Sequence, residues 1–139
     1  MTAQERMSRD VRSVPPQLGV WAALSIMRQE GIRHLLVTDG ERLVGVLSNR
    51  DYRKILEQAG PDGSVQHIPE FKVAQIMTPQ DQLRTARPET PMLDVANSLY
   101  TRRVGCIPVL DARNQPIGIL TQKDVMAALV DLLTHRHSA

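Results

Sequence analysis

Apolar residues in this chain change their spacing in a regular order, and the order is the same in both halves. In one segment of each half they lie three and four residues apart, which places them on one face of a helix. These residues are Val20, Ala23, Leu24 and Met27 in the first half, and Met92, Val95, Ala96 and Leu99 in the second. The spacing predicts an amphipathic helix over residues 17–29 and another over residues 91–102.

Short apolar runs on either side of each predicted helix are typical of strands. A stretch that ends near a proline precedes the helix, and two runs around a polar turn follow it. The expected strands cover residues 11–14, 35–37 and 43–47 in the first half, and residues 83–86, 106–110 and 117–120 in the second. Asp39-Gly40 at the first turn indicates a β-hairpin. A closing helix begins near Ser48 or Thr121, so the predicted order is β-α-β-β-α, twice.

The two halves also match residue by residue. Pro16 aligns with Pro88 at an offset of 72, and one extra residue in the second turn shifts the offset to 73. Residues 45–51 read Gly-Val-Leu-Ser-Asn-Arg-Asp, and residues 118–124 read Gly-Ile-Leu-Thr-Gln-Lys-Asp. Both copies consist of a glycine, two apolar residues, a hydroxyl residue, two polar residues of which the second is basic, and an aspartate. Such an internal repeat sets the architecture before any local pattern does.

These matches divide the chain into a first repeat at residues 7–58, a connector at residues 59–73 and a second repeat at residues 74–134. The connector is rich in glycine and proline and interrupts all periodicity. A single repeat of about 50 residues buries too little apolar surface to be stable alone. We therefore expect an α/β (α+β) fold in which the two repeats pack sheet against sheet about a pseudo-twofold axis.

Composition narrows the range of partners. The chain has 139 residues, of which 42% are hydrophobic and 23% are charged, as is typical of a soluble globular protein. Its net charge of +2 and its four aromatic residues give no reason to expect a nucleic-acid partner. No apolar run approaches the roughly 18 residues of a membrane span, and the polar N-terminus lacks a secretory signal. We expect a cytoplasmic protein without a membrane partner.

With Met7-Ser8 and Met77-Thr78 ahead of the two predicted helices, and the seven-residue motif after each hairpin, the chain resembles a tandem pair of cystathionine-β-synthase (CBS) domains, or Bateman module. The strand motif that this family prefers, Leu-Pro-Val, reads Ile-Pro-Val at residues 107–109 and Leu-Leu-Val at residues 35–37. The resemblance implies a regulatory module, not an enzyme, that binds an adenosine nucleotide (AMP, ADP, ATP or S-adenosylmethionine) in the cleft between the repeats. It also implies a homodimer, an unidentified protein partner and no obligatory cofactor.

The residue types in the repeated motif suit a nucleotide. A helix that begins directly after a strand offers backbone N–H groups to a phosphate, and a hydroxyl at that point caps the helix or donates to the phosphate. A carboxylate three residues later accepts hydrogen bonds from the two hydroxyls of a ribose. The candidate ligand-binding residues are Ser48, Arg50, Asp51, Thr121, Lys123, Asp124, Arg33, His34, Gly105, Cys106, Ser8 and Thr78. We expect no catalytic residue and no metal ligand.

The same motif also has a purely structural interpretation. Ser/Thr-x-x-Asp is a capping box with Asp in place of Glu, and a capping box needs no ligand. The corresponding alternative function is a ligand-free dimerisation or interaction scaffold, with the helices over residues 17–29 and 91–102 as contact faces. Two further expectations concern packing: Cys106 is a half-buried strand residue, and Ala128, Leu129 and Leu132 form the apolar side of the closing helix.

Overall fold

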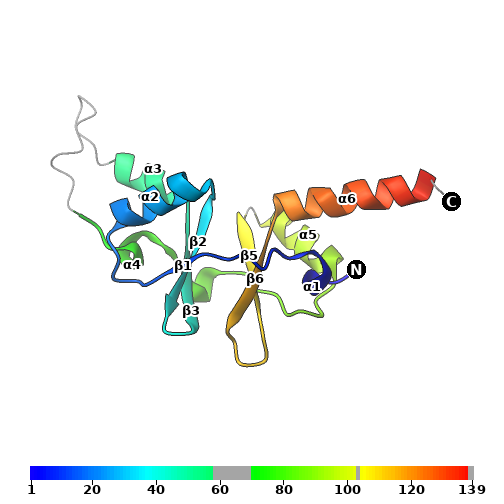
Figure 1. Ribbon diagram of the computed structural model, residues 1–139, viewed down its shortest axis with the longest axis horizontal. Coiled ribbons are helices and arrows are strands. Elements are labelled where there is room, and N and C mark those ends of the chain that lie inside the picture. Colours follow the sequence, from blue (N-terminus) through cyan, green and yellow to red (C-terminus); the bar gives the residue numbers. More distant parts are fainter. Residues whose placement is uncertain (58–69, 103, 138–139) are drawn as a thin grey trace. The chain divides into compact units, whose positions relative to one another are not determined.

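The structure is a computed structural model and describes residues 1–57, 70–102 and 104–137 (Figure 1). It divides into two compact units. One consists of Arg12–Leu83, and the other combines Met1–Val11 with Arg84–Ala139. Each unit contains one of the two predicted hairpins and a hydrophobic core of its own. A mixed α/β fold with two similar halves is therefore confirmed.

The unit Arg12–Leu83 contains a four-stranded sheet in the order β1-β2-β3-β4. Its strands are β1 (Ser13–Val14), β2 (His34–Asp39), β3 (Arg42–Ser48) and β4 (Thr78–Pro79). Strand β1 is parallel to β2, whereas β2, β3 and β4 are antiparallel neighbours. The helices are α2 (Val20–Glu30), α3 (Asp51–Leu56) and α4 (Val73–Ile76), with the short 3-10 helix η1 (Gln80–Gln82).

The apolar face of α2 is buried as the helical spacing predicts. Val20, Ala23 and Met27 pack in one core with Leu35 and the other buried residues of the sheet. The helix ends at Gly31, which adopts a left-handed conformation with φ of 66° and donates its N–H to the carbonyl of Met27. Glycine is favoured at such a position because it has no Cβ to clash.

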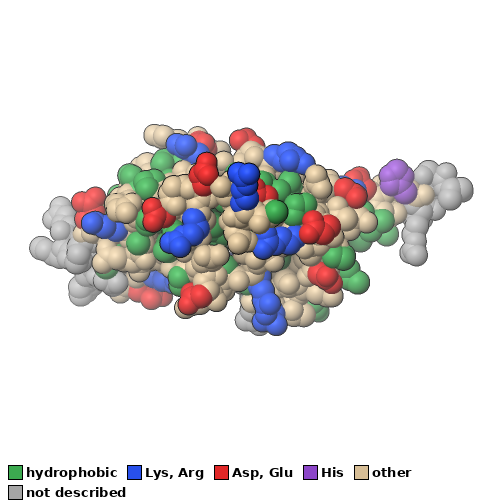
Figure 2. Space-filling model, turned by 90° about the horizontal axis from the view of Figure 1, so that it is seen from below, with side chains coloured by type: hydrophobic (Ala, Val, Ile, Leu, Met, Phe, Trp, Pro, Cys, Tyr) green, Lys and Arg blue, Asp and Glu red, His purple; other side chains and the backbone are tan. Residues whose placement is uncertain are grey.

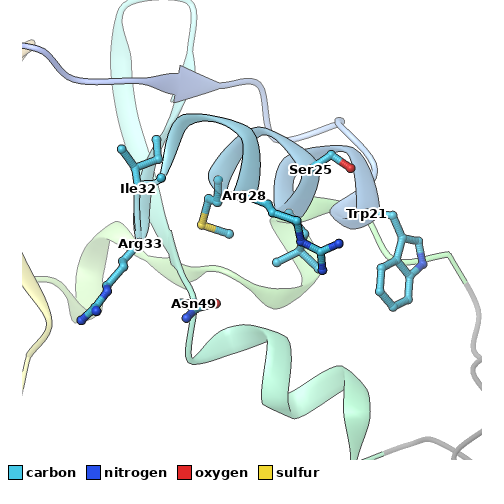
Figure 3. A pocket seen from close by; sticks show the side chains of 9 residues that line it. Trp21, Ser25, Arg28, Ile32, Arg33 and Asn49 are labelled. Carbon is cyan, nitrogen blue, oxygen red and sulfur yellow. The ribbon is translucent and has the colours of Figure 1, made fainter.

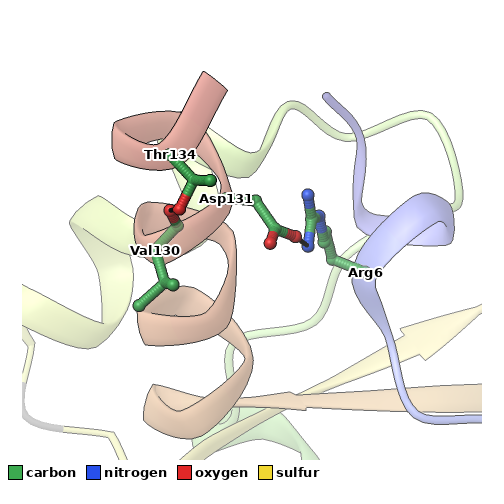
Figure 4. Close-up of polar contacts among 4 residues, drawn as sticks. All are labelled: Arg6, Val130, Asp131 and Thr134. Atoms are coloured by element: carbon green, nitrogen blue, oxygen red, sulfur yellow. Dashed lines mark hydrogen bonds and ion pairs between the residues drawn. The ribbon is translucent and has the colours of Figure 1, made fainter. Parts of the chain in front are cut away.

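The unit that combines Met1–Val11 with Arg84–Ala139 is built around a two-stranded hairpin of β5 (Cys106–Leu110) and β6 (Pro116–Thr121). Its helices are α1 (Ala3–Arg6), α5 (Met92–Thr101) and α6 (Gln122–His137). Isolated bridges add Ser8 beside Ile119 and Ala86 beside Val109. An ion pair between Arg6 of α1 and Asp131 of α6 joins the two ends of the chain within this unit (Figure 4).

The leading segment of each repeat packs on the hairpin of the other repeat. Met7 belongs to the core around β5 and β6, and Met77 packs against the core around β2 and β3. The repeat boundaries that the sequence suggests, 7–58 and 74–134, therefore differ from the compact units, which break at Val11 and at Leu83. The reason is apolar burial: each Met lies against a motif glycine, Met7 against Gly118 and Met77 against Gly45.

Two packing expectations for the second half are wrong. Ala128 is buried, but the side chains of Leu129 and Leu132 are 43% and 52% exposed, so α6 leaves much of its apolar surface uncovered. In Figure 1, this helix extends from the end of β6 beyond α5. Cys106 is fully buried instead of half-buried, with 4% exposure. No helix in the described ranges is both long and apolar enough to cross a membrane.

The close approach at Gly45 generates a stability prediction. A Cβ at this position would lie 2.5 Å from the Met77 sulfur and 2.7 Å from the backbone carbonyl of Thr78, which is fixed by its pairing with β3. We expect Gly45→Ala to lower the free energy of unfolding by about 1–3 kcal/mol, as overpacking does in cores. Urea unfolding followed by circular dichroism measures this change.

Gly19→Ala is the matched control. A Cβ there meets the carboxylate end of the exposed Glu70 side chain, which can move away, so the loss should stay below about 1 kcal/mol. Equal losses for Gly45→Ala and Gly19→Ala would contradict this account of the packing between β3 and β4.

Candidate functional site

The first copy of the motif forms a corner between β3 and α3. Asp51, three residues after Ser48, turns back toward the end of the strand: its Oδ2 accepts the backbone N–H of Ser48 at 2.8 Å and the Ser48 hydroxyl at 3.3 Å. Its Oδ1 lies 3.0 Å from the Nζ of Lys54. Asp51 is only 3% exposed, so its negative charge is stabilised by these neighbouring groups and not by water. We call the end of β3 with Asp51 and the adjoining start of β2 the first corner.

The second copy of the motif has the same geometry at the junction of β6 and α6. Asp124 Oδ2 accepts the backbone N–H of Thr121 at 2.9 Å and the Thr121 hydroxyl at 3.4 Å. Asp124 is half-buried, in contrast to Asp51. We call the end of β6 with Asp124 and the adjoining start of β5 the second corner. In both corners the hydroxyl and the backbone N–H of the serine or threonine donate to the aspartate carboxylate three residues later. The bond from the backbone N–H resembles one half of a capping box, although α3 itself begins at Asp51.

Two more of the predicted residues lie at the first corner, His34 at the start of β2 and Arg33 directly before it. His34 is the register partner of Ser48, and the carbonyl of Arg33 accepts the N–H of Asn49 at 2.9 Å. Burial lowers the pKa of His34, and the positive charges of Arg50 and Arg33 lower it further against the opposing effect of Asp51. The imidazole is therefore neutral at pH 7, and these residues lie within electrostatic reach of one another.

Strand β5 supplies the equivalent positions at the second corner, with different chemistry. Cys106 is the register partner of Thr121 and follows Gly105 in the chain. Burial raises the pKa of the Cys106 thiol to about 12, so the thiol is protonated at neutral pH and is a poor nucleophile. Lys123 is exposed beside the start of α6. Compared with the first corner, an arginine and a histidine are replaced by a glycine and a buried thiol.

Ser8 and Thr78 lie one strand away from the motif. Ser8 is paired with Ile119 of β6, and Thr78 is paired with Val46 of β3. The leading segment of each repeat packs on the hairpin of the other repeat. Ser8 therefore belongs to the unit of the second corner, and Thr78 to the unit of the first. From chain order alone, Ser8 would be grouped with the first corner and Thr78 with the second. All twelve predicted residues thus fall into two sets, one in each unit.

A pocket of about 440 Å³ next to the first corner contains residues that the sequence did not single out. The pocket is lined from α2, from the loop that precedes β2 and from the motif itself, by Trp21, Leu24, Ser25, Met27, Arg28, Gly31, Ile32, Arg33 and Asn49. Figure 3 shows that Trp21 and Arg28 project from α2 on the side of α3. Asn49 lies inside the seven-residue motif. Arg28 belongs to no motif that the sequence analysis identified.

Comparison with known proteins identifies relatives over most of the chain. The family model for the CBS domain matches residues 3–58 and 73–131. The mitochondrial CBS domain-containing protein CBSX3 of Arabidopsis thaliana is 32% identical over 122 residues, which cover 85% of this chain and 54% of the plant protein. Inosine-5'-monophosphate dehydrogenase of Methanocaldococcus jannaschii is 29% identical over 125 residues, 89% of this chain and 23% of the enzyme. The chain thus spans about a quarter to about half the length of these relatives.

Solved structures resemble the whole chain. The CBS-pair protein CBSX2 from Arabidopsis thaliana has a TM-score of 0.78 at 27% identity, with 96% of each chain covered. A structure of CBSX2 in complex with AMP has a TM-score of 0.79, also at 27% identity, and covers 94% of this chain and 97% of CBSX2. The CBS domain pair of protein MJ0100, in complex with 5'-methylthioadenosine and S-adenosyl-L-methionine, has a TM-score of 0.79 at 22% identity and covers 94% and 97%. This last likeness concerns the fold alone.

The environment of His34 predicts how stability depends on pH. Because the pKa of His34 is lower in the folded protein than its usual value of about 6.5, the unfolded chain binds a proton first as the pH falls. The contribution of His34 to the free energy of unfolding is therefore complete above about pH 6.5. It is lost as the pH falls from there toward the lower pKa of the folded protein. We expect the free energy of unfolding to fall between about pH 7 and pH 5, and His34→Gln to reduce that slope.

Arg50→Gln serves as the second variant in this experiment. It removes a positive charge that lowers the pKa of His34, so its slope should lie between those of wild type and His34→Gln. Urea unfolding at several pH values measures the slopes. A His34→Gln protein with the wild-type slope would show that His34 does not carry this pH dependence.

Proposed function

Since the chain belongs to the CBS-domain family and consists of a tandem pair of such domains, we propose that it is a regulatory module that binds an adenosine nucleotide in a cleft between its two repeats. The ligand is of the AMP, ADP, ATP or S-adenosylmethionine type. The observation that carries the proposal is the recurrence of one carboxylate arrangement at two corners, with Asp51 and Asp124 held in the same way. The AMP complex of CBSX2 supports the choice of ligand class.

The first corner can accept a ribose if one partner of Asp51 is exchanged. Oδ2 of Asp51 stays bonded to the N–H of Ser48, which fixes the direction of the carboxylate. Oδ1 is engaged by Lys54, whose side chain is 57% exposed. Because the Lys54 side chain is exposed, its ammonium group can turn into solvent, and a ribose hydroxyl can take its place beside Oδ1. A carboxylate has about four acceptor positions, enough for the Ser48 bonds and a ribose diol together.

Regulation follows from differential binding. A nucleotide that contacts both repeats stabilises the relative arrangement for which it has the higher affinity, and this alters the surface offered to a partner protein. We propose no catalytic step. Cys106, the one cysteine in the chain, is a poor nucleophile because burial raises the pKa of its thiol. Acidic and basic side chains are interspersed over the face in Figure 2, a pattern that does not favour nucleic acid.

A homodimer is the second part of the proposal. Apolar side chains on the outside of α5 and α6 are exposed to an extent that is unusual for a surface without a partner. They are Leu93, Tyr100, Met126, Leu129, Val130, Leu132 and Leu133, with exposures from 43% to 86%. The same observation supports the alternative function, a ligand-free dimerisation scaffold. A cytoplasmic location stays a prediction from the sequence.

Calorimetry and thermal unfolding with AMP, ADP, ATP, S-adenosylmethionine and NADH test nucleotide binding. At 100 times its Kd, a nucleotide that binds the folded protein stabilises it by about 2.7 kcal/mol. Asp51→Asn combined with Asp124→Asn should abolish the response. Asparagine is preferred to alanine because its amide oxygen still accepts the N–H of Ser48 or Thr121, so the corner keeps its shape.

Asp39→Asn provides the matched control, since Asp39 lies at the opposite end of β2 from His34. We expect it to leave the response to nucleotides unchanged. A wild-type protein that responds to no nucleotide at millimolar concentration, while native mass spectrometry shows a stable dimer, would favour the scaffold. A double variant that still responds like the wild type would remove the two aspartates from the site.

A further inference from the structure

We propose that two copies of this chain associate through unlike faces, with α5 of one copy antiparallel to α2 of the other and its apolar side chains directed into the pocket beside the first corner. This inference rests on the homodimer of the proposed function and names the two surfaces that meet. It follows from a difference between helix faces that the repeat makes equivalent at an offset of 72. The face of α2 consists of Trp21, Leu24, Ser25 and Arg28, and the face of α5 of Leu93, Ala96, Asn97 and Tyr100.

The two faces differ in shape. On α2, all four residues of the face line the pocket of about 440 Å³ (Figure 3). On α5, Leu93 and Tyr100 project from the surface with 70% and 86% exposure. Within the described part of the unit Arg12–Leu83, no large hydrophobic side chain is exposed in this way. A hollow and a projecting apolar face fit each other better than two faces of the same kind, and close fit is typical of the core of an interface.

Charge sets the direction in which the two helices pair. Arg28 lies in the last turn of α2 and Asp94 in the first turn of α5, and both are exposed. Neither side chain forms an ion pair within the residues that the structure describes. Antiparallel helices bring the end of α2 beside the start of α5, so Arg28 meets Asp94 of the second copy. Parallel helices would bring Arg28 beside Arg102 at the end of α5, and facing like charges are unfavourable.

The opposite ends of the two helices agree with this direction. Trp21, near the start of α2, comes beside Tyr100 of the second copy, and aromatic rings favour contact with each other. The carboxylate of Glu70 lies next to Gly19, directly before α2. Arg102 of the second copy arrives at this point, so each end of the helix pair joins a basic and an acidic side chain.

Exchange of charge between two proteins tests the pairing. Arg28→Glu places two acidic groups in each contact of its own dimer, and Asp94→Arg places two basic groups there. We expect each variant to dimerise at least about ten-fold more weakly than the wild type. A mixture of the two variants should form a heterodimer as stable as the wild-type dimer, because one contact keeps the natural pair of charges and the other reverses it. Sedimentation equilibrium measures the dissociation constants.

Arg42→Glu is the matched control, because Arg42 is exposed at the turn of the first hairpin and belongs to neither helix. It should leave the dimer as stable as the wild type, and it should not restore dimerisation when mixed with Asp94→Arg. A mixture of Arg28→Glu and Asp94→Arg that is no more stable than the average of the two separate variants would show that like faces meet.

Disulfide cross-linking locates the contact without reliance on charge. Ser25 and Asn97 are the exposed residues at the middle of the two faces, and the natural Cys106 is buried. After oxidation, a mixture of Ser25→Cys and Asn97→Cys proteins should contain a linked heterodimer, whereas neither protein alone should link to itself. Linkage of either variant with itself, or no linkage in the mixture, would overturn this inference and leave the homodimer standing if the wild type is still dimeric. A monomeric wild type would overturn the homodimer, while calorimetry tests nucleotide binding separately.

Discussion

The hydrogen bond between a motif carboxylate and the backbone N–H three residues before it is the interaction on which each half depends. At the first corner, Asp51 holds the N–H of Ser48 just where β3 ends, and this sets the direction in which the chain enters α3. The antiparallel pairing of β3 with β2 makes His34 the register partner of Ser48 and so places the motif beside the start of β2. The bond from Thr121 to Asp124 repeats the arrangement in the other unit.

A buried carboxylate is stable only when its charge and its acceptor positions are satisfied. Asp51 meets this requirement with a backbone N–H, a hydroxyl and an exposed lysine, which differ in how readily they can be replaced. The backbone N–H is part of the corner and stays. The lysine side chain is exposed, so its ammonium group can turn into solvent. One side chain can therefore hold the end of β3 in the free protein and, under the proposed function, receive a ribose without a change of fold.

The sequence predicted helices α2 and α5 and both hairpins because their patterns are local, but the strand expected over residues 83–86 is reduced to a single bridge between Ala86 and Val109. Helix α2 carries a clear helical spacing and a glycine at its end, and the first hairpin has Asp39-Gly40 at its turn. The grouping of Arg33 and His34 with the motif followed from the pairing of two adjacent strands. These features need no information from distant parts of the chain.

What the sequence could not predict depends on distant contacts. Met7 and Met77 have equivalent local surroundings, so no pattern says that each packs on the glycine of the other repeat. The exposure of Leu129 cannot be predicted from the sequence either, since the apolar residues of an uncovered helix face have the same spacing as those of a covered one. Arg28 reaches the pocket beside the first corner only because α2 crosses the sheet there. In each case the decisive neighbour is far away in sequence.

Amide NMR spectra of the isotope-labelled protein during titration with AMP and with ATP test the central claim most directly, because they report on the motif N–H groups themselves. The account predicts that the largest shifts occur at the amides of Ser48 to Asp51 and Thr121 to Asp124. Saturable binding with shifts confined to α5 and α6, and with both motif segments unchanged, would contradict it.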